Sequence, residues 1–108
     1  MAKRMDIAVN YLKLTEDFPK EEKFGLSLQI TRAGVSIPCN IAEGSSRHSE
    51  KDYARFIENS LGSSYELETQ LLLSQRLSYG KQDLINHTII DVNDDQKMLM
   101  RFGNKLNK

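Results

Sequence analysis

The chain of 108 residues contains one cysteine, two prolines and no surplus of charge of either sign. A single cysteine cannot form a disulfide within the chain, which predicts a reduced, cytoplasmic protein rather than a disulfide-stabilised one. Lysine plus arginine and aspartate plus glutamate each total 15, so the formal net charge is zero. This balance argues against an obligate nucleic-acid binder, which usually has a basic surplus or a basic face, although it leaves room for a local patch.

Long apolar runs are also missing. No run approaches the roughly 18 apolar residues of a membrane span. The N-terminal Met1 to Arg4 are basic, but the apolar stretch of a signal peptide does not follow them. The composition, 39% hydrophobic and 28% charged, is that of an ordinary globular protein, and the length predicts a single domain over residues 1–108.

Motifs that carry catalysis or bind cofactors do not occur either. Cys39, His48 and His87 are the soft metal ligands, and no two of them have a metal-ligand spacing, so no metal site is predicted. The chain has no glycine-rich phosphate loop and no nucleophile elbow, which predicts a non-enzymatic protein without a cofactor. Cys39, beside Pro38, is expected to be a small packed residue rather than a nucleophile.

What the sequence does contain is apolar residues at helical spacing. They predict four helices, over about residues 3–17, from Pro19 to between Gly44 and Ser46, over about 50–79 and over about 82–106. Ser49 is expected to cap the third helix and Gly80 to end it. Four amphipathic helices joined by short loops predict an all-α, antiparallel up-down-up-down four-helix bundle. The stripes expected to face the core are Ile7, Tyr11, Leu14 and Phe18; Ile30, Ala33, Ile37 and Ile41; Tyr53, Ile57, Ser60, Ser64, Leu67, Leu71 and Ser74; and Ile85, Ile89, Val92, Gln96, Leu99, Gly103 and Leu106.

Two of the helices carry more apolar surface than one core requires. The second helix has a further stripe, as does the third, and a helix that is apolar on more than one face is expected to be buried on more than one side. Because one bundle core cannot use all of these stripes, the sequence predicts self-association through the second or third helix. The additional stripes are Phe24, Leu28, Thr31 and Val35, and Leu61, Tyr65 and Leu72.

The stretch around Pro38 is the most unusual part of the pattern. Proline inside a helix removes one backbone hydrogen bond and crowds the carbonyl four residues earlier, at a cost of about 3 kcal/mol. That earlier residue is Gly34, whose missing Cβ lets the backbone move aside, and Ile37 and Ile41 keep the apolar spacing across the proline. These features favour a helix that is kinked at Pro38. The alternative is two helices with a break at Ile37, because residues before proline avoid the α region.

Charged residues on the middle helices suggest two kinds of contact. Glu66 or Glu68 on the third helix is expected to form a structural ion pair with Arg32 or Arg47, within the chain or between subunits. The alternative is that these glutamates are simply solvated.

A basic stripe formed by Arg47, Lys51 and Arg55 opens the third helix, and with Lys20 and Lys23 it could contact phosphates. Acidic residues nearby weaken the positive potential of this stripe, so an ordinary solvated helix face is the competing interpretation.

Five short segments carry a resemblance to a known family. They are FPKEEKFGL (residues 18–26), QITRA (29–33), SIPCNIAEG (36–44), LGS (61–63) and ELETQL (66–71). In order and spacing they resemble the four-helix-bundle proteins encoded in 23S rRNA intervening sequences, and the fold is similar to that of the accessory variability determinant of diversity-generating retroelements. The match covers roughly residues 14–79.

The resemblance implies a four-helix bundle that assembles into a homopentameric ring. In the retroelement relatives, the basic surface of the ring engages nucleic acid and a reverse transcriptase; for the intervening-sequence proteins the biochemical role is not established. Arg32 and Arg47 match arginines of the family, whereas Thr31 stands where relatives often have a second arginine and Cys39 stands where serine is usual. The expected function is therefore a non-enzymatic oligomeric scaffold associated with RNA or a ribonucleoprotein, and the alternative is a protein–protein scaffold that binds no nucleic acid.

Overall fold

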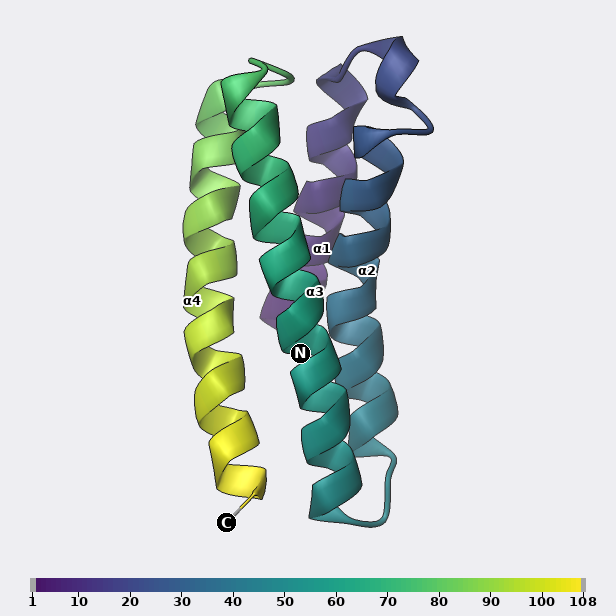
Figure 1. The fold of residues 1–108 in the computed structure, drawn as a ribbon, viewed down its shortest axis with the longest axis vertical. Coiled ribbons are helices and arrows are strands. Elements are labelled where there is room, and N and C mark those ends of the chain that lie inside the picture. Colours follow the sequence, from purple (N-terminus) through teal and green to yellow (C-terminus); the bar gives the residue numbers. More distant parts are fainter. Residues whose placement is uncertain (1, 108) are drawn as a thin grey trace.

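The computed structural model describes residues 2–107, with side chains for Met5 and for residues 8–107. Four helices run alternately up and down in a body of 44 × 22 × 21 Å, and the described residues form no strand (Figure 1). This architecture confirms the predicted four-helix bundle. The elements in chain order are α1 (Ala2–Leu14), the 3₁₀ turns η1 (Thr15–Asp17) and η2 (Lys20–Glu22), α2 (Leu26–Ser45), α3 (Glu50–Arg76) and α4 (Gln82–Leu106).

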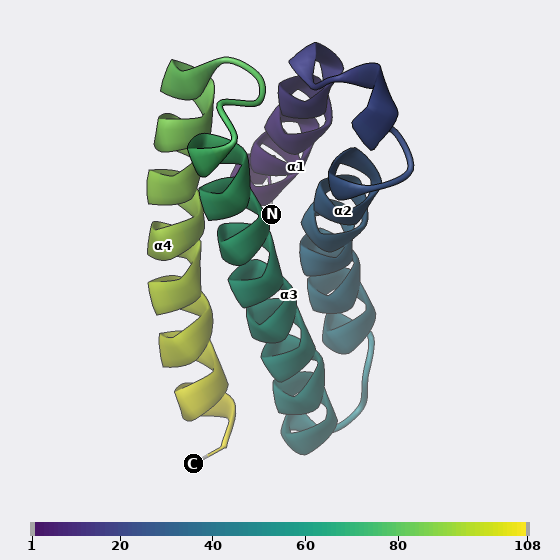
Figure 2. The same ribbon diagram turned by 45° about the horizontal axis from the view of Figure 1, so that its top comes forward.

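The two ends of the bundle differ in what they contain. The lower end, at the bottom of Figure 1, carries the α2–α3 loop (residues 46–49) and the end of α4, whereas the upper end carries η1, η2 and the α3–α4 loop (residues 77–81). At 13 residues, α1 is about half as long as α3 and α4, and it lies beside the upper half of the other helices (Figures 1 and 2). Over residues 2–107, the bundle therefore has four helices in its upper half and three in its lower half.

The start of the second helix lies later than expected. Pro19 precedes the short turn η2 rather than opening a long helix, and α2 begins at Leu26. A carboxylate oxygen of Glu22 accepts a hydrogen bond from the Leu26 backbone N–H at 3.1 Å, which satisfies one of the free donors at the new helix start. The sequence signal at Pro19 thus marked a turn, because a proline at a first helical position is compatible with one turn as well as with a long helix.

The third helix begins as predicted and ends slightly earlier. The Ser49 hydroxyl accepts a hydrogen bond from the Asp52 backbone N–H at 3.1 Å, which is the N-cap contact expected for α3. At the other end, α3 stops at Arg76, and Ser78 adopts a positive φ of 57° before Gly80 does so at 70°. Serine rather than glycine therefore takes the first left-handed position after α3.

The second helix continues through its proline. Pro38 lies inside α2, and both Ile37 and Ile41 are buried, so the alternative of two helices broken at Ile37 is wrong. The kink itself stays a prediction. Around Pro38, the Ser60 hydroxyl donates to the Ile37 carbonyl at 2.9 Å and ties α2 to α3.

The core follows the predicted stripes. Ile30, Leu67, Leu71, Ile85 and Val92 are completely excluded from solvent, and Ser60, Ser64 and Ser74 are buried among them. These serines belong to the stripe that the sequence predicted to face the core. Tyr53, Ile89 and Leu106 are half-buried members of the same stripes, and the side chain of Ile7 lies outside the described part of the structure.

The position of α1 depends on one glycine. The ring of Tyr11 packs directly on the backbone of α2 at Gly34, where a Cβ atom would overlap the ring. The sequence had assigned Gly34 to the bend at Pro38, and the structure adds a role in admitting Tyr11. Burial raises the pKa of the Tyr11 hydroxyl, and the carboxylates of Asp95 and Asp91 raise it further.

Within residues 2–107, no helix is both long and apolar enough to cross a membrane.

Candidate nucleic-acid and subunit interfaces

The predicted basic stripe lies at the lower end of the bundle. Arg47, Lys51 and Arg55 are all exposed, and the guanidinium groups of Arg47 and Arg55 lie over the ring of Phe56, at 4.7 and 5.5 Å from its centre. Arg47 also forms an ion pair of 3.0 Å with Glu43, one helical turn earlier. Both guanidinium groups therefore lie close to the Phe56 ring, and the charge of Arg47 is already partly neutralised by Glu43.

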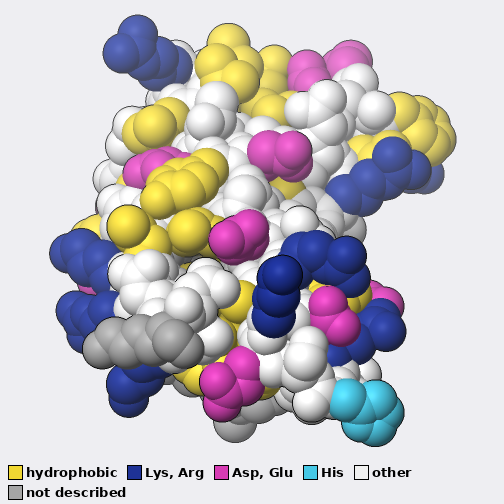
Figure 3. Space-filling model, turned by 60° about the horizontal axis from the view of Figure 1, so that its bottom comes forward, with side chains coloured by type: hydrophobic (Ala, Val, Ile, Leu, Met, Phe, Trp, Pro, Cys, Tyr) yellow, Lys and Arg dark blue, Asp and Glu magenta, His cyan; other side chains and the backbone are white. Residues whose placement is uncertain are grey.

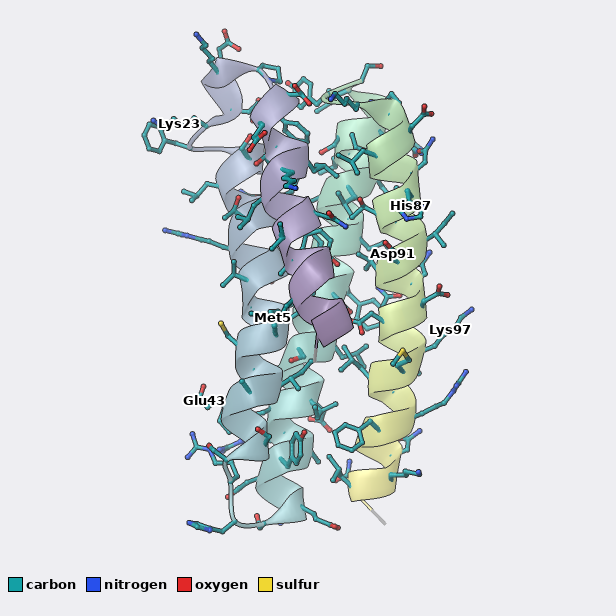
Figure 4. All side chains as sticks on the ribbon, turned by 180° about the vertical axis from the view of Figure 1, so that it is seen from behind. Met5, Lys23, Glu43, His87, Asp91 and Lys97 are labelled. Atoms are coloured by element: carbon teal, nitrogen blue, oxygen red, sulfur yellow. The ribbon has the colours of Figure 1, made fainter. Side chains whose placement is uncertain are left out.

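The other two predicted phosphate contacts lie far from this stripe. Lys20 and Lys23 belong to η2 and the turn after it, at the upper end of the bundle. Lys23 appears at the top of the view in Figure 4, whereas Glu43 marks the lower end. The structure therefore does not bring the five predicted cations onto one continuous surface of a single chain.

A second group of cations was missed by the sequence reasoning. Lys97, Arg101 and Lys105 are exposed and spaced four residues apart on the last three turns of α4. Residues 96–107 contain no aspartate or glutamate, whereas residues 43–58 contain four acidic side chains against three basic ones. A separate count of charge along each helix would have identified the α4 stripe. Figure 3 shows basic side chains along the α4 side of the lower end.

The expected ion pairs of Arg32 and Arg47 with Glu66 and Glu68 do not form within the described part of one chain. Arg47 pairs with Glu43 instead, because Glu43 lies only four residues earlier, in the last turn of α2, and is within reach of the loop without crossing the bundle. Glu68 accepts a hydrogen bond of 3.2 Å from the Gln96 amide of α4. Pairing across a subunit contact stays a prediction.

Arg32 and Glu66 nevertheless share an open groove between α2 and α3. Its volume is about 480 Å³, and a hydrogen bond of 2.9 Å between the hydroxyls of Ser36 and Ser63 lies beside it. The amide oxygen of Gln70 lines this groove, is buried, and has no hydrogen-bond partner among the described atoms. The groove is thus a polar surface with one unused acceptor.

The additional apolar stripe of the second helix remains largely uncovered. Phe24 is 81% exposed and Val35 41% exposed, whereas Leu28 and Thr31 are half-buried. Together with the exposed Leu12 of α1, these residues form what we call the α1–α2 face. Cys39 is also exposed on α2, so the expectation that it is packed was wrong: the core uses the neighbouring positions Ile37 and Ile41.

The additional stripe of the third helix forms another apolar surface. Tyr65 and Leu72 are 45% and 43% exposed, and Leu61 is half-buried. The Tyr65 hydroxyl reaches the sulfur of Met100 on α4 at 3.8 Å, so the surface spans both helices and is called the α3–α4 face. The two faces lie on different helix pairs, and the bundle's own core covers neither completely.

The described residues contain no group of three or more histidine, cysteine, aspartate or glutamate side chains that could hold a metal ion. By its fold the protein belongs to the class of up-down four-helix bundles. The family comparison is more specific: the family described as 23S rRNA-intervening sequence protein matches residues 1–101, and the chain belongs to this family.

A solved structure supports the same assignment. The chain is similar to a crystal structure described as a protein with unknown function from the S23 ribosomal protein family of Bacteroides thetaiotaomicron. The two chains are 27% identical, with a TM-score of 0.85, over 93% of this chain and 94% of the other. No curated protein sequence matches this chain. The similarity to the retroelement accessory protein stays a prediction.

Proposed function

We propose that the protein is a non-enzymatic oligomeric scaffold that associates with nucleic acid, as RNA or within a ribonucleoprotein. The observation that carries the oligomer is the pair of uncovered apolar faces on different helix pairs. Leaving a large apolar side chain in water forfeits roughly 1.5–3 kcal/mol relative to full burial, which favours covering them. Patches of this kind usually mark interfaces in soluble proteins.

Two different faces favour a ring. When the α1–α2 face of one subunit meets the α3–α4 face of the next, the contact is head-to-tail, and such contacts close into a ring if the rotation allows. A homopentamer, implied by the family resemblance, is the assembly we propose. A protein partner such as a reverse transcriptase would then bind the outside of the ring.

The nucleic-acid part of the proposal has separate support. The family takes its name from sequences inserted in 23S rRNA, and the structural neighbour is assigned to a family named for a ribosomal protein. Both basic stripes at the lower end are exposed and offer cations to phosphates. The neutral net charge favours the alternative, a protein–protein scaffold that binds no nucleic acid.

Light scattering at micromolar concentration tests the oligomer. A mass near 12.4 kDa would refute it, and about five times that mass is expected for a pentamer. Leu72→Lys should reduce the mass by placing a charge in the contact. Asn59→Lys, at an exposed position of α3 that lies about 140° around the helix from Leu72, should leave the mass unchanged. A stable dimer would keep the interface and exclude the pentamer.

A binding titration tests the nucleic-acid part. Binding through phosphates must weaken steeply as salt rises. No detectable binding of RNA or DNA at low salt and micromolar protein would leave the protein-only scaffold as the function.

A further inference from the structure

One side of the bundle is left without its fourth helix. With 13 residues, α1 rises about 20 Å, whereas the 25 residues of α4 rise about 37 Å. In Figure 4, Met5 in the first turn of α1 lies near mid-height, and α1 begins just below it. The lower half of the side between α2 and α4 is therefore covered by no helix of the described chain.

Aromatic and sulfur-containing side chains lie on this uncovered side. The ring of Phe102 on α4 meets the ring of Tyr53 on α3 at 5.1 Å between centres and an angle of 85°. Phe102 is 36% exposed, and Met98, one turn earlier on α4, is exposed as well. The edge contact with Tyr53 holds the Phe102 ring in place while part of the ring remains accessible to a ligand.

The α4 cations border the same side chains. Lys97, Arg101 and Lys105 form one stripe, and Met98 and Phe102 each follow a member of that stripe by one residue. Met98 also precedes Arg101 by three residues, and Phe102 precedes Lys105 by three. Because residues three apart are neighbours on a helix surface, the apolar pair lies along one edge of the cationic row. No ion pair or hydrogen bond of the described residues neutralises the three cations, in contrast to Arg47, which is paired with Glu43.

We propose that this surface, Lys97, Arg101 and Lys105 with Met98 and Phe102, binds single-stranded nucleic acid. The cations contact successive phosphates, and unstacked bases lie on the Phe102 ring and the Met98 side chain. Single-strand binders combine a cationic track with aromatic platforms in this way. A duplex hides the faces of its bases, so the apolar edge would have no partner there. The inference rests on the proposed function and assigns its site and strand form.

The test uses the full-length protein and a fluorescein-labelled, unstructured 20-nucleotide RNA. Anisotropy titrations between 50 and 200 mM salt measure the affinity and its salt dependence, with a duplex of the same sequence as the second probe. We expect tighter binding of the single strand. Equal affinity for the duplex, together with no effect of changes at Phe102, would overturn the single-strand assignment.

Two triple variants with the same change of charge locate the site. Lys97→Gln, Arg101→Gln and Lys105→Gln together should weaken binding at least tenfold and reduce the slope of log affinity against log salt by about two, since each lost phosphate contact removes about 0.7. The matched triple at Arg47, Lys51 and Arg55 should change binding less than threefold. The opposite ranking would overturn the α4 site while leaving the proposed function intact, and absence of wild-type binding would remove both.

A change at the aromatic edge tests the bases separately from the phosphates. Phe102→Leu should weaken single-strand binding about fivefold or more without changing the salt slope. Because Phe102 also contacts Tyr53, thermal unfolding must first show that this variant is folded. Met98→Ala, at an exposed position without ring contacts, provides the second variant and should act in the same direction. Unchanged single-strand affinity in both folded variants would overturn the role of the apolar edge.

Discussion

The upper and lower halves of the bundle use the same helices in different ways. In the upper half, α1 contributes Tyr11 and Leu14, and the turn after it contributes Phe18, to a core in which each of them is less than a tenth exposed. In the lower half, where α1 is absent, Tyr53 is only half-buried and Phe102 is partly exposed on the corresponding side. Ile57 and Leu99 are buried in the lower half by the other helices, so only the apolar residues of α3 and α4 that face the side of α1 differ in burial between the two halves. The side covered by α1 in the upper half contributes to stability, whereas the same side in the lower half is accessible to a ligand.

The largest expected effect comes from removing the α1 contribution to the upper core. Leu14→Ala should reduce the free energy of unfolding by about 2–5 kcal/mol, because the side chain is buried and its loss leaves a cavity. The control Lys13→Ala, at an exposed position of the same helix outside the α1–α2 face, should stay within about 0.5 kcal/mol. Urea denaturation measures both. Equal effects of the two changes would mean that α1 does not define the upper half.

A smaller effect is expected where α1 touches α2. Gly34→Ala should destabilise the protein by about 1–3 kcal/mol, because the added methyl group overlaps the Tyr11 ring. Gly62→Ala is the control: its Cβ meets nothing within 4 Å, and alanine should stabilise this exposed helical position by about 0.5–1 kcal/mol. Chemical denaturation should show changes of opposite sign in the free energy of unfolding for the two variants. This result would distinguish a glycine in contact with a neighbouring side chain from one without such a contact. A stabilising Gly34→Ala would contradict the packing of Tyr11.

The lower end should respond weakly to loss of a charge. Arg47→Ala should cost about 1 kcal/mol or less, since its pair with Glu43 is exposed and its ring contact with Phe56 is at the surface. Differential scanning calorimetry should compare the melting temperatures of the wild type and Arg47→Ala, for the monomer and for the oligomer. A loss well above 1 kcal/mol would instead support the predicted pairing of Arg47 with a glutamate of a neighbouring subunit.

The smallest effect concerns pH. The pKa of Tyr11 is raised in the folded state, so above pH 10 the unfolded chain ionises this tyrosine first and stability is lost as pH rises. At pH 10.5 the loss from this residue should be under about 1 kcal/mol. Tyr11→Phe should remove that part of the alkaline decline, whereas the contribution of Tyr79, whose pKa is also raised in the folded state, should remain. Parallel stability–pH curves for the two proteins would contradict the burial of the hydroxyl.

Most of the fold could be predicted from the sequence, because helical periodicity is a local property. The stripe on α3 identified its buried serines, and the pattern across Pro38 correctly indicated one continuous helix. The start of α2 was misplaced because Pro19 and the acidic residues after it suit a single turn as well as a long helix. The exposure of Cys39 was missed because a thiol resembles a small apolar residue in any hydrophobicity pattern.

The candidate sites were less predictable. The additional apolar stripes on α2 and α3 were recognised in the sequence, and their exposure in a single chain follows from the limited size of one core. The cations of α4 were not predicted, because they belong to no motif. Only a count of acidic and basic residues along each helix identifies them. Pairing of Arg47 with Glu66 or Glu68 was not found within one chain, since a nearer carboxylate on its own side of the loop was available at Glu43.

By itself the sequence determined that there are four helices, which stripe of each faces the core, and that α2 continues through Pro38. These properties depend on neighbours within one or two helical turns, and the order of the residues specifies them directly. The tertiary structure alone decided that α1 covers only the upper half, that Lys20 and Lys23 lie far from Arg47, and that Phe102 borders three cations on a side that no other described helix covers. These spatial relations depend on where each helix begins and ends relative to its neighbours. No local sequence pattern encodes these relative positions.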